Sequence, residues 1–151
     1  MKIFKALLKP ITIAGLFIVL VAADCSNEEP VDTEKISVDF TFEIQVHDSV
    51  SIPLPGELVY VDTRKYTGGE VKGVFQYQMS TNSDGWVVKY LGYNFNYDGD
   101  YAVFHASMKG YDDYTEPVVH EIVYYNDVKN AANGNDHITY TVTGFLEKTD
   151  Y

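Results

Sequence analysis

The feature that most constrains the fold is a strict alternation of apolar and polar side chains from Ile36 to His47. Six apolar residues take every second position, and polar or charged residues stand between them. A period of two over twelve residues predicts a β-strand with one buried side and one solvent-facing side. The strand is long enough to bend between two sheets, so we expect an all-β domain.

Further strand-like segments follow, with turn signals about every ten residues. They cover residues 57–62, 70–79, 86–97, 101–108, 118–125 and 138–146, with hairpin-type turns expected at 82–85 and 98–100 and a linker at 126–137. Seven short strands predict a single domain over residues 36–151, folded as a seven-stranded immunoglobulin-like β-sandwich. The alternative is a small up-and-down β-barrel of the lipocalin kind, because the last five strands also suit a meander.

The N-terminus has the composition of an export signal. Lys2, Lys5 and Lys9 occur without any acidic residue, and residues 11–23 are apolar and uncharged. This apolar stretch is shorter than the roughly 20 residues that a membrane-spanning helix needs. Residues 1–24 are therefore predicted to be a signal peptide that is absent from the mature protein.

Cys25 is the only cysteine in the chain, and it follows the sequence Val-Ala-Ala-Asp. This segment resembles a bacterial lipobox, which implies acylation of Cys25 and a membrane attachment through its lipid. Asp24 stands where that pattern has glycine, alanine or serine. Cleavage after Ala23 is therefore kept as the alternative, and it would leave the protein periplasmic or secreted.

Residues 25–29, with the sequence Cys-Ser-Asn-Glu-Glu, resemble the starts of surface-exposed lipoproteins of Bacteroidota. That resemblance implies the outer face of the outer membrane. The polar and acidic residues after Cys25, up to position 35, are expected to form a flexible tether. Residues 51–77 and 123–142 also resemble parts of the immunoglobulin-like TraQ-type conjugal transfer lipoproteins.

The mature chain is strongly acidic. Residues 1–25 hold three of the 11 basic residues and one of the 22 acidic residues, so 8 basic and 21 acidic residues remain, for a net charge near −13. Nucleic acids and anionic lipid surfaces attract basic patches, so this balance argues against nucleic acid as a partner and against docking on anionic lipid.

No motif for metal binding or catalysis is recognised. His47, His105, His120 and His137 stand singly, although the strands of His105 and His120 are expected to be neighbours. The sequence has no G-x-S-x-G nucleophile motif, and the aspartates and asparagines of the loops suit turns. We therefore predict no metal, no cofactor and no enzymatic activity.

Aromatic residues crowd the predicted hairpin after residue 85. They suggest a binding surface made of Trp86, Tyr90, Tyr93, Tyr97 and Tyr101. Exposed aromatic faces stack on sugars and anchor protein interfaces. The chain is thus expected to be a non-enzymatic cell-envelope lipoprotein, a binding or assembly module for protein or glycan. The alternative is a lipocalin-like carrier of a small apolar ligand.

Overall fold

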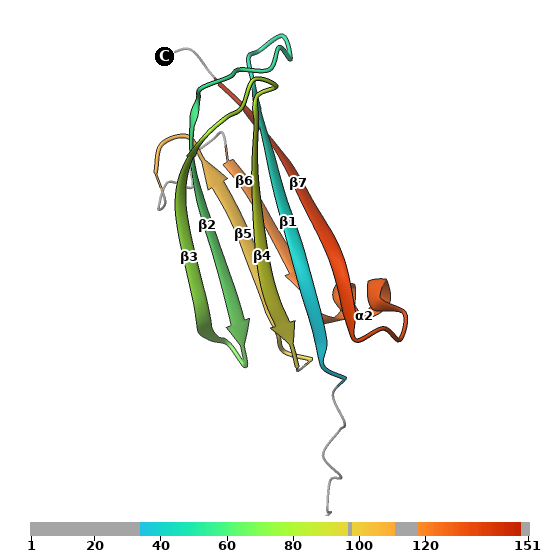
Figure 1. Ribbon diagram of the computed structural model, residues 1–151. Coiled ribbons are helices and arrows are strands. Elements are labelled where there is room, and N and C mark those ends of the chain that lie inside the picture. The colour runs from blue at the N-terminus through green and yellow to red at the C-terminus, as the bar shows by residue number, and fades with distance from the viewer. Residues whose placement is uncertain (1–33, 97, 111–117, 149–151) are drawn as a thin grey trace, which may run out of the picture. The chain divides into compact units, whose positions relative to one another are not determined.

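The computed structural model describes residues 34–96, 98–110 and 118–148 (Figure 1). The strands confirm the predicted segments, with shifts of a few residues at their ends. The elements in chain order are β1 (Ile36–His47), β2 (Leu58–Thr67), β3 (Glu70–Ser80), β4 (Trp86–Phe95), β5 (Tyr101–Ser107), β6 (Val118–Tyr124), α2 (Tyr125–Ala132) and β7 (His137–Glu147).

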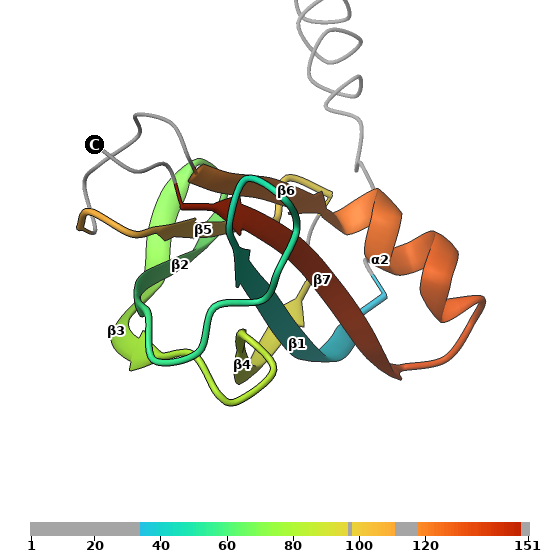
Figure 2. The ribbon, with the colours of Figure 1, turned by 90° about the horizontal axis from the view of Figure 1, so that it is seen from above.

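The strands form two sheets that face each other, as Figures 1 and 2 show. One sheet has the order β4-β1-β7 and the other the order β3-β2-β5-β6. β1 pairs antiparallel with β4 and parallel with β7. The all-β, seven-stranded sandwich is therefore confirmed.

The sheets are open, and the alternative of a closed barrel is wrong. β4 and β7 end one sheet, β3 and β6 end the other, and no ladder joins the two sheets among the described residues. The first strand does pair with the last one, yet that pair lies inside a three-stranded sheet and closes nothing. The lipocalin-like carrier required a closed barrel and so loses its structural basis.

The pairing follows the immunoglobulin layout in its central strands. β1 and β4 take the places of strands B and E, while β3, β2, β5 and β6 take those of C′, C, F and G. The departure is β7, which lies parallel to β1 where strand A would be.

The core lies between the sheets and is built on the alternation in β1. All six apolar residues of β1 are at most 1 % exposed. Phe40 packs against Phe104 of the facing sheet, with ring centroids 4.9 Å apart, and against Tyr93 at 5.8 Å. Burial of these aromatic and branched side chains is the main stabilising term of the fold.

The expected hairpin turns at 82–85 and 98–100 instead carry the chain from one sheet to the other. At the first, the side-chain oxygen of Asn82 accepts hydrogen bonds from the N–H groups of Asp84 and Trp86, both at 2.9 Å. At the second, Asp100 accepts a hydrogen bond from the N–H of Asn96 at 2.9 Å. Turn chemistry was identified correctly, but it does not reveal to which sheet the next strand belongs.

The predicted linker 126–137 contains a helix, α2. Figure 2 shows α2 beside β6 and β7. Its buried residues are Tyr125, Val128 and Ala132, which belong to the same core as the strands. Asp127 accepts a hydrogen bond from the N–H of Tyr124 at 2.9 Å, and Asn133 ends the helix in the left-handed conformation. Because α2 separates β6 from β7, these strands join different sheets and form no hairpin.

The two sheets approach each other closely at Gly144. A Cβ atom there would lie 2.5 and 2.6 Å from the methyl carbons of Val119 in β6. A side chain at position 144 would require Val119 or the strands to shift, so glycine permits the observed packing of β7 against β6. In the described part of the chain, no helix is long and apolar enough to cross a membrane.

Candidate functional site

The outer face of the β4-β1-β7 sheet carries the site. Strand alternation turns the polar residues of β1 away from the core, and the register places matching residues of β4 and β7 beside them. Three threonines of β7, Thr139, Thr141 and Thr143, line one side of this face. We call this surface the outer face; its other members include Ser37, Asp39, Thr41, Glu43, Gln45, Trp86, Val88, Tyr90, Gly92, Asn94, His137 and Phe145.

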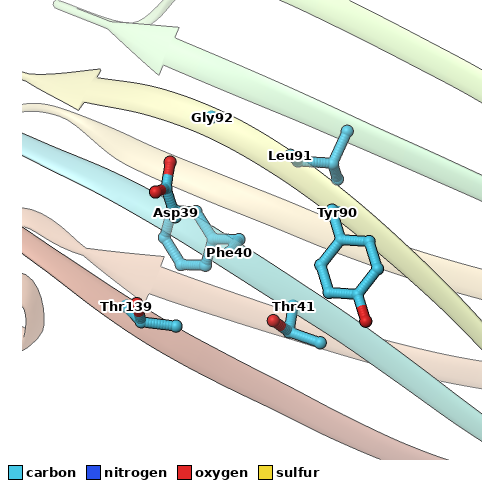
Figure 3. A pocket seen from close by; sticks show the side chains of 7 residues that line it. All are labelled: Asp39, Phe40, Thr41, Tyr90, Leu91, Gly92 and Thr139. Carbon is cyan, nitrogen blue, oxygen red and sulfur yellow. The ribbon is translucent and has the colours of Figure 1, made fainter.

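A shallow hollow of about 440 Å³ lies on this face. Its lining residues are Asp39, Phe40, Thr41, Tyr90, Leu91, Gly92 and Thr139, which Figure 3 shows on three neighbouring strands. Gly92 pairs with Asp39 and has no side chain to fill the space between Tyr90 and Asn94. A Cβ atom at Gly92 would lie 3.8 Å from a carboxylate oxygen of Asp39. The hollow exists because position 92 is glycine.

Tyr90 forms the aromatic side of the hollow and is 73 % exposed. It lies directly across from Thr41, which in turn pairs with Thr141. An aromatic side chain that stays this exposed gains little from the fold, because most of its apolar surface remains in water. Its ring is therefore available to stack on a ligand, with threonine hydroxyl groups beside it.

Asp39 supplies the charge at the hollow. Its Oδ2 atom lies 3.1 Å from Nε2 of His137, and both side chains are more than half exposed. Exposed pairs of this kind contribute little to stability. The carboxylate of Asp39 is thus free to exchange its partner for a ligand hydroxyl group.

A second aromatic group lies further along the same face. Trp86 and Phe145 meet with ring centroids 6.1 Å apart, and His47 lies 6.5 Å from Phe145. Phe145 is 58 % exposed. Trp86 and Tyr90 are four residues apart on one strand, so their Cα atoms are separated by roughly 13 Å. The two aromatic groups therefore suit an elongated ligand that lies along the strands.

The five aromatic residues predicted to form one surface are separated by the structure. Trp86 and Tyr90 share the outer face, but Tyr93 points into the core and is 6 % exposed. Tyr101 belongs to the other sheet, where its ring stacks on Tyr66. Tyr97 and the predicted lipid site Cys25 lie outside the described residues, so their roles stay predictions.

Tyr93 has a structural role in the core and does not belong to the binding surface. Its hydroxyl group donates a hydrogen bond to Oγ1 of Thr63 at 3.0 Å. Burial raises the pKa of Tyr93 above its ordinary value of 10.0; the hydrogen bond to Thr63 opposes this shift, and the charge of Asp62 adds to it. This phenol stays neutral in the folded protein and is not available to a ligand on the surface.

Sequence reasoning missed Asp39, Phe145 and the threonine row of β7. For the β7 residues the signal was present in the sequence, because the three threonines and Phe145 stand at every second position of residues 137–147. It could not be used without the parallel pairing of β7 with β1, which alone brings this row beside Asp39 and Thr41.

Two histidines and an ion pair lie close together on the outer side of the other sheet. His105 and His120 pair across β5 and β6 as predicted, with ring centroids 6.0 Å apart. The neighbouring Asp62 is held by the guanidinium group of Arg64 at 3.0 and 2.5 Å. Within residues 34–96, 98–110 and 118–148, no group of three or more histidine, cysteine, aspartate or glutamate side chains is arranged to hold a metal ion.

No known protein family matches the chain, and no curated protein matches it either. The chain is similar to solved structures, among them the dioxygenase domain of a dioxygenase carbohydrate-binding protein fusion from the cellulolytic bacterium Streptomyces sp. SirexAA-E. It is 18 % identical, covers 79 % of this chain and 84 % of its own, and superposes with a TM-score of 0.43.

Proposed function

We propose that this protein is a lipid-anchored, non-enzymatic binding module of the bacterial cell envelope that takes a glycan on its outer face. The observation that carries the proposal is the exposed ring of Tyr90 beside a hollow lined by Asp39, Thr41 and Thr139. The lipid anchor at Cys25 is proposed from the signal segment and lipobox of the sequence, and the cell-surface location from the resemblance of residues 25–29 to surface-exposed lipoproteins.

The chemistry of the outer face matches a sugar better than a protein. A sugar ring offers a C–H face that packs on an aromatic ring, and hydroxyl groups that need partners on both sides. Here Tyr90 supplies the ring, while Asp39, Thr41 and Thr139 supply acceptors and donors at the same hollow. The core of a protein interface, by contrast, is depleted of charged residues, whereas Asp39 and Glu43 lie in the middle of this face.

The length of the face favours a chain of several sugars over a single one. Polar rows run along β1 and β7 between the Tyr90 end and the Trp86–Phe145 pair. A ligand that spans both aromatic groups would gain contacts at each end without a deep pocket. Shallow binding of this kind is expected to be weak for one site and stronger when many anchored copies meet a polymer.

The test uses Trp86, the only tryptophan in the chain, as a built-in probe. The purified protein is titrated with a panel of soluble oligosaccharides and polysaccharides while tryptophan fluorescence is recorded. We expect at least one glycan to shift the emission in a saturable way, and Tyr90→Ala to weaken that binding about tenfold or more. Tyr124→Ala is the matched control, because Tyr124 is also exposed but lies on the other sheet.

A protein ligand is the competing outcome. If no glycan of the panel changes the emission, while Tyr90→Ala abolishes capture of an envelope protein by the wild type, the glycan proposal is wrong and the face is a protein interface. Equal glycan binding by Tyr90→Ala and Tyr124→Ala would show that the outer face is not the glycan-binding site.

The anchor is tested separately. The full chain and Cys25→Ala are expressed in a bacterial host with radiolabelled palmitate. Label on the wild type alone is expected, together with membrane-bound wild type and soluble variant. Equal label on both chains, or label on neither, would contradict acylation of Cys25.

A further inference from the structure

The second sheet carries a stack of three tyrosines at one end of its outer side. Tyr66 of β2, Tyr101 of β5 and Tyr124 of β6 are direct neighbours in the register. The rings of Tyr66 and Tyr101 are 4.5 Å apart and inclined by only 6°, and those of Tyr101 and Tyr124 are 6.0 Å apart. Such a row places three phenol side chains side by side on adjacent strands, with the rings of Tyr66 and Tyr101 covering each other's faces.

Exposed aliphatic side chains extend this surface on both edges of the sheet. Val71 pairs with Tyr66, Val74 pairs with Arg64, and Ile122 lies next to the row of Tyr124. Val71 is 47 % exposed, Val74 50 %, Ile122 37 % and Tyr124 53 %. We call these residues the tyrosine patch: Tyr66, Tyr101, Tyr124, Val71, Val74 and Ile122. A contiguous apolar area of this kind on a very acidic chain indicates a docking surface.

Two ion pairs lie next to the patch. Arg64 is paired with the carboxylate of Asp62, and Lys72 lies 2.5 Å from the carboxylate of Glu70. The patch itself consists of amphipathic rings and aliphatic groups and contains no charged residue. This composition suits the interfacial layer of a lipid bilayer, where tyrosine keeps its ring in an apolar environment and its hydroxyl group in water.

The start of the domain lies at the same end as the patch. The hydroxyl group of Tyr125 donates a hydrogen bond to the backbone carbonyl of Glu34 at 3.0 Å, and Tyr124 of the patch is the preceding residue. Figure 1 shows β1 beginning at this end of the sandwich. Residues 26–33 connect Cys25 to Glu34, and this segment can span only about 30 Å when fully extended.

We infer that the tyrosine patch rests on the bilayer when Cys25 is acylated; this inference depends on the lipid anchor of the proposed function. The anchor keeps the patch within a short tether length of the membrane, so docking becomes an intramolecular step with a high effective concentration. Weak apolar contacts are then sufficient, although the acidic chain would not bind the bilayer without its lipid.

This docking also orients the protein. The patch lies on the outer side of the β3-β2-β5-β6 sheet, and the hollow with Tyr90 lies on the outer face of the other sheet. In a two-layer sandwich these surfaces point in opposite directions, as Figure 2 shows for the layers. A protein that lies on its tyrosine patch therefore turns its proposed glycan site away from the membrane.

The experiment places a single tryptophan on each side in turn. The full chain is purified from bacterial membranes and reconstituted into phosphatidylcholine vesicles with and without brominated acyl chains. Both variants carry Trp86→Phe; one adds Tyr124→Trp in the patch, and the matched control adds Tyr90→Trp on the opposite face. Vesicle flotation is recorded for both.

We expect both variants to float, the tryptophan at 124 to lose most of its emission in brominated vesicles, and the tryptophan at 90 to be unchanged. Adding Val71→Glu and Val74→Glu to the Tyr124→Trp variant should restore most of the emission while flotation persists. Flotation with equal quenching at both positions, or with none at 124, would overturn docking and leave the anchor intact. Failure to float would overturn the anchor, and docking with it.

Discussion

The hydroxyl group of Tyr93 donates a hydrogen bond to Oγ1 of Thr63 across the interior of the sandwich, at 3.0 Å. Tyr93 comes from β4 and Thr63 from β2, so this bond links the two sheets through the core. Thr63 is completely buried. The pair therefore gives the two layers a polar connection as well as an apolar one.

Removal of this hydroxyl group should destabilise the domain. Tyr93→Phe keeps the ring contacts with Phe40 and Phe104 but leaves the hydroxyl of Thr63 without this partner. We expect the free energy of unfolding in urea to fall by about 1–3 kcal/mol. Tyr90→Phe on the exposed outer face is the control and should change stability by less than about 0.5 kcal/mol.

Stability should also fall at alkaline pH because of Tyr93. Its pKa is raised by burial in the folded state, so above pH 10.0 the unfolded chain loses this proton while the folded chain keeps it. The unfolded state then binds fewer protons, and the free energy of unfolding declines as pH rises. Urea unfolding between about pH 9 and pH 11 should show a shallower decline in Tyr93→Phe. Identical slopes in both proteins would contradict this role.

Gly144→Ala tests the crossing of β7 and β6. The added methyl group meets Val119 at 2.5 Å, so the sheets must shift or Val119 must change its rotamer. We expect a loss of about 1–3 kcal/mol in the free energy of unfolding. Val119→Ala in the same chain should recover part of this loss, with a coupling energy of about 1 kcal/mol. Gly73→Ala, whose new methyl group would lie 3.6 Å from its nearest neighbour, serves as the tolerated control.

Gly92→Leu tests whether the hollow itself binds the ligand. A Cβ atom fits there, 3.8 Å from Asp39, while a longer side chain would occupy the space beside Tyr90. We expect thermal stability to stay near that of the wild type and glycan binding to drop about tenfold or more. Unchanged binding would show that the ligand lies elsewhere on the outer face.

The sequence reveals the strands far better than their order in space. The alternation in β1 predicts its bounds and its buried side fully, because a period of two leaves one choice of inner face. The end of β2 was missed: Arg64 and Lys65 look like loop residues, but the backbone of both is paired with β3 and β5. Charged residues therefore do not prevent a strand, even when it has a neighbour on each side.

The candidate site depended on information that no local pattern contains. Tyr90 was identified because it is aromatic, whereas Tyr93 has the same side chain and lies in the core, three residues further along the strand. Strand parity distinguishes them only once the register with β1 is known. Helix α2 was missed for a related reason, since its apolar residues are few and its burial depends on the sandwich beside it.

The parallel pairing of β1 with β7 has a mechanical consequence. Eleven consecutive residues of β1, from Ser37 to His47, are paired with β7. Under the lipid anchorage proposed above, tension that lifts the protein off the membrane enters the domain at the start of β1. The component of this force along the strand axis loads the hydrogen bonds of the β1–β7 ladder together in shear, rather than opening them one after another from an end. The strand next to the proposed tether thus has the longest ladder of the described sheets to resist such tension.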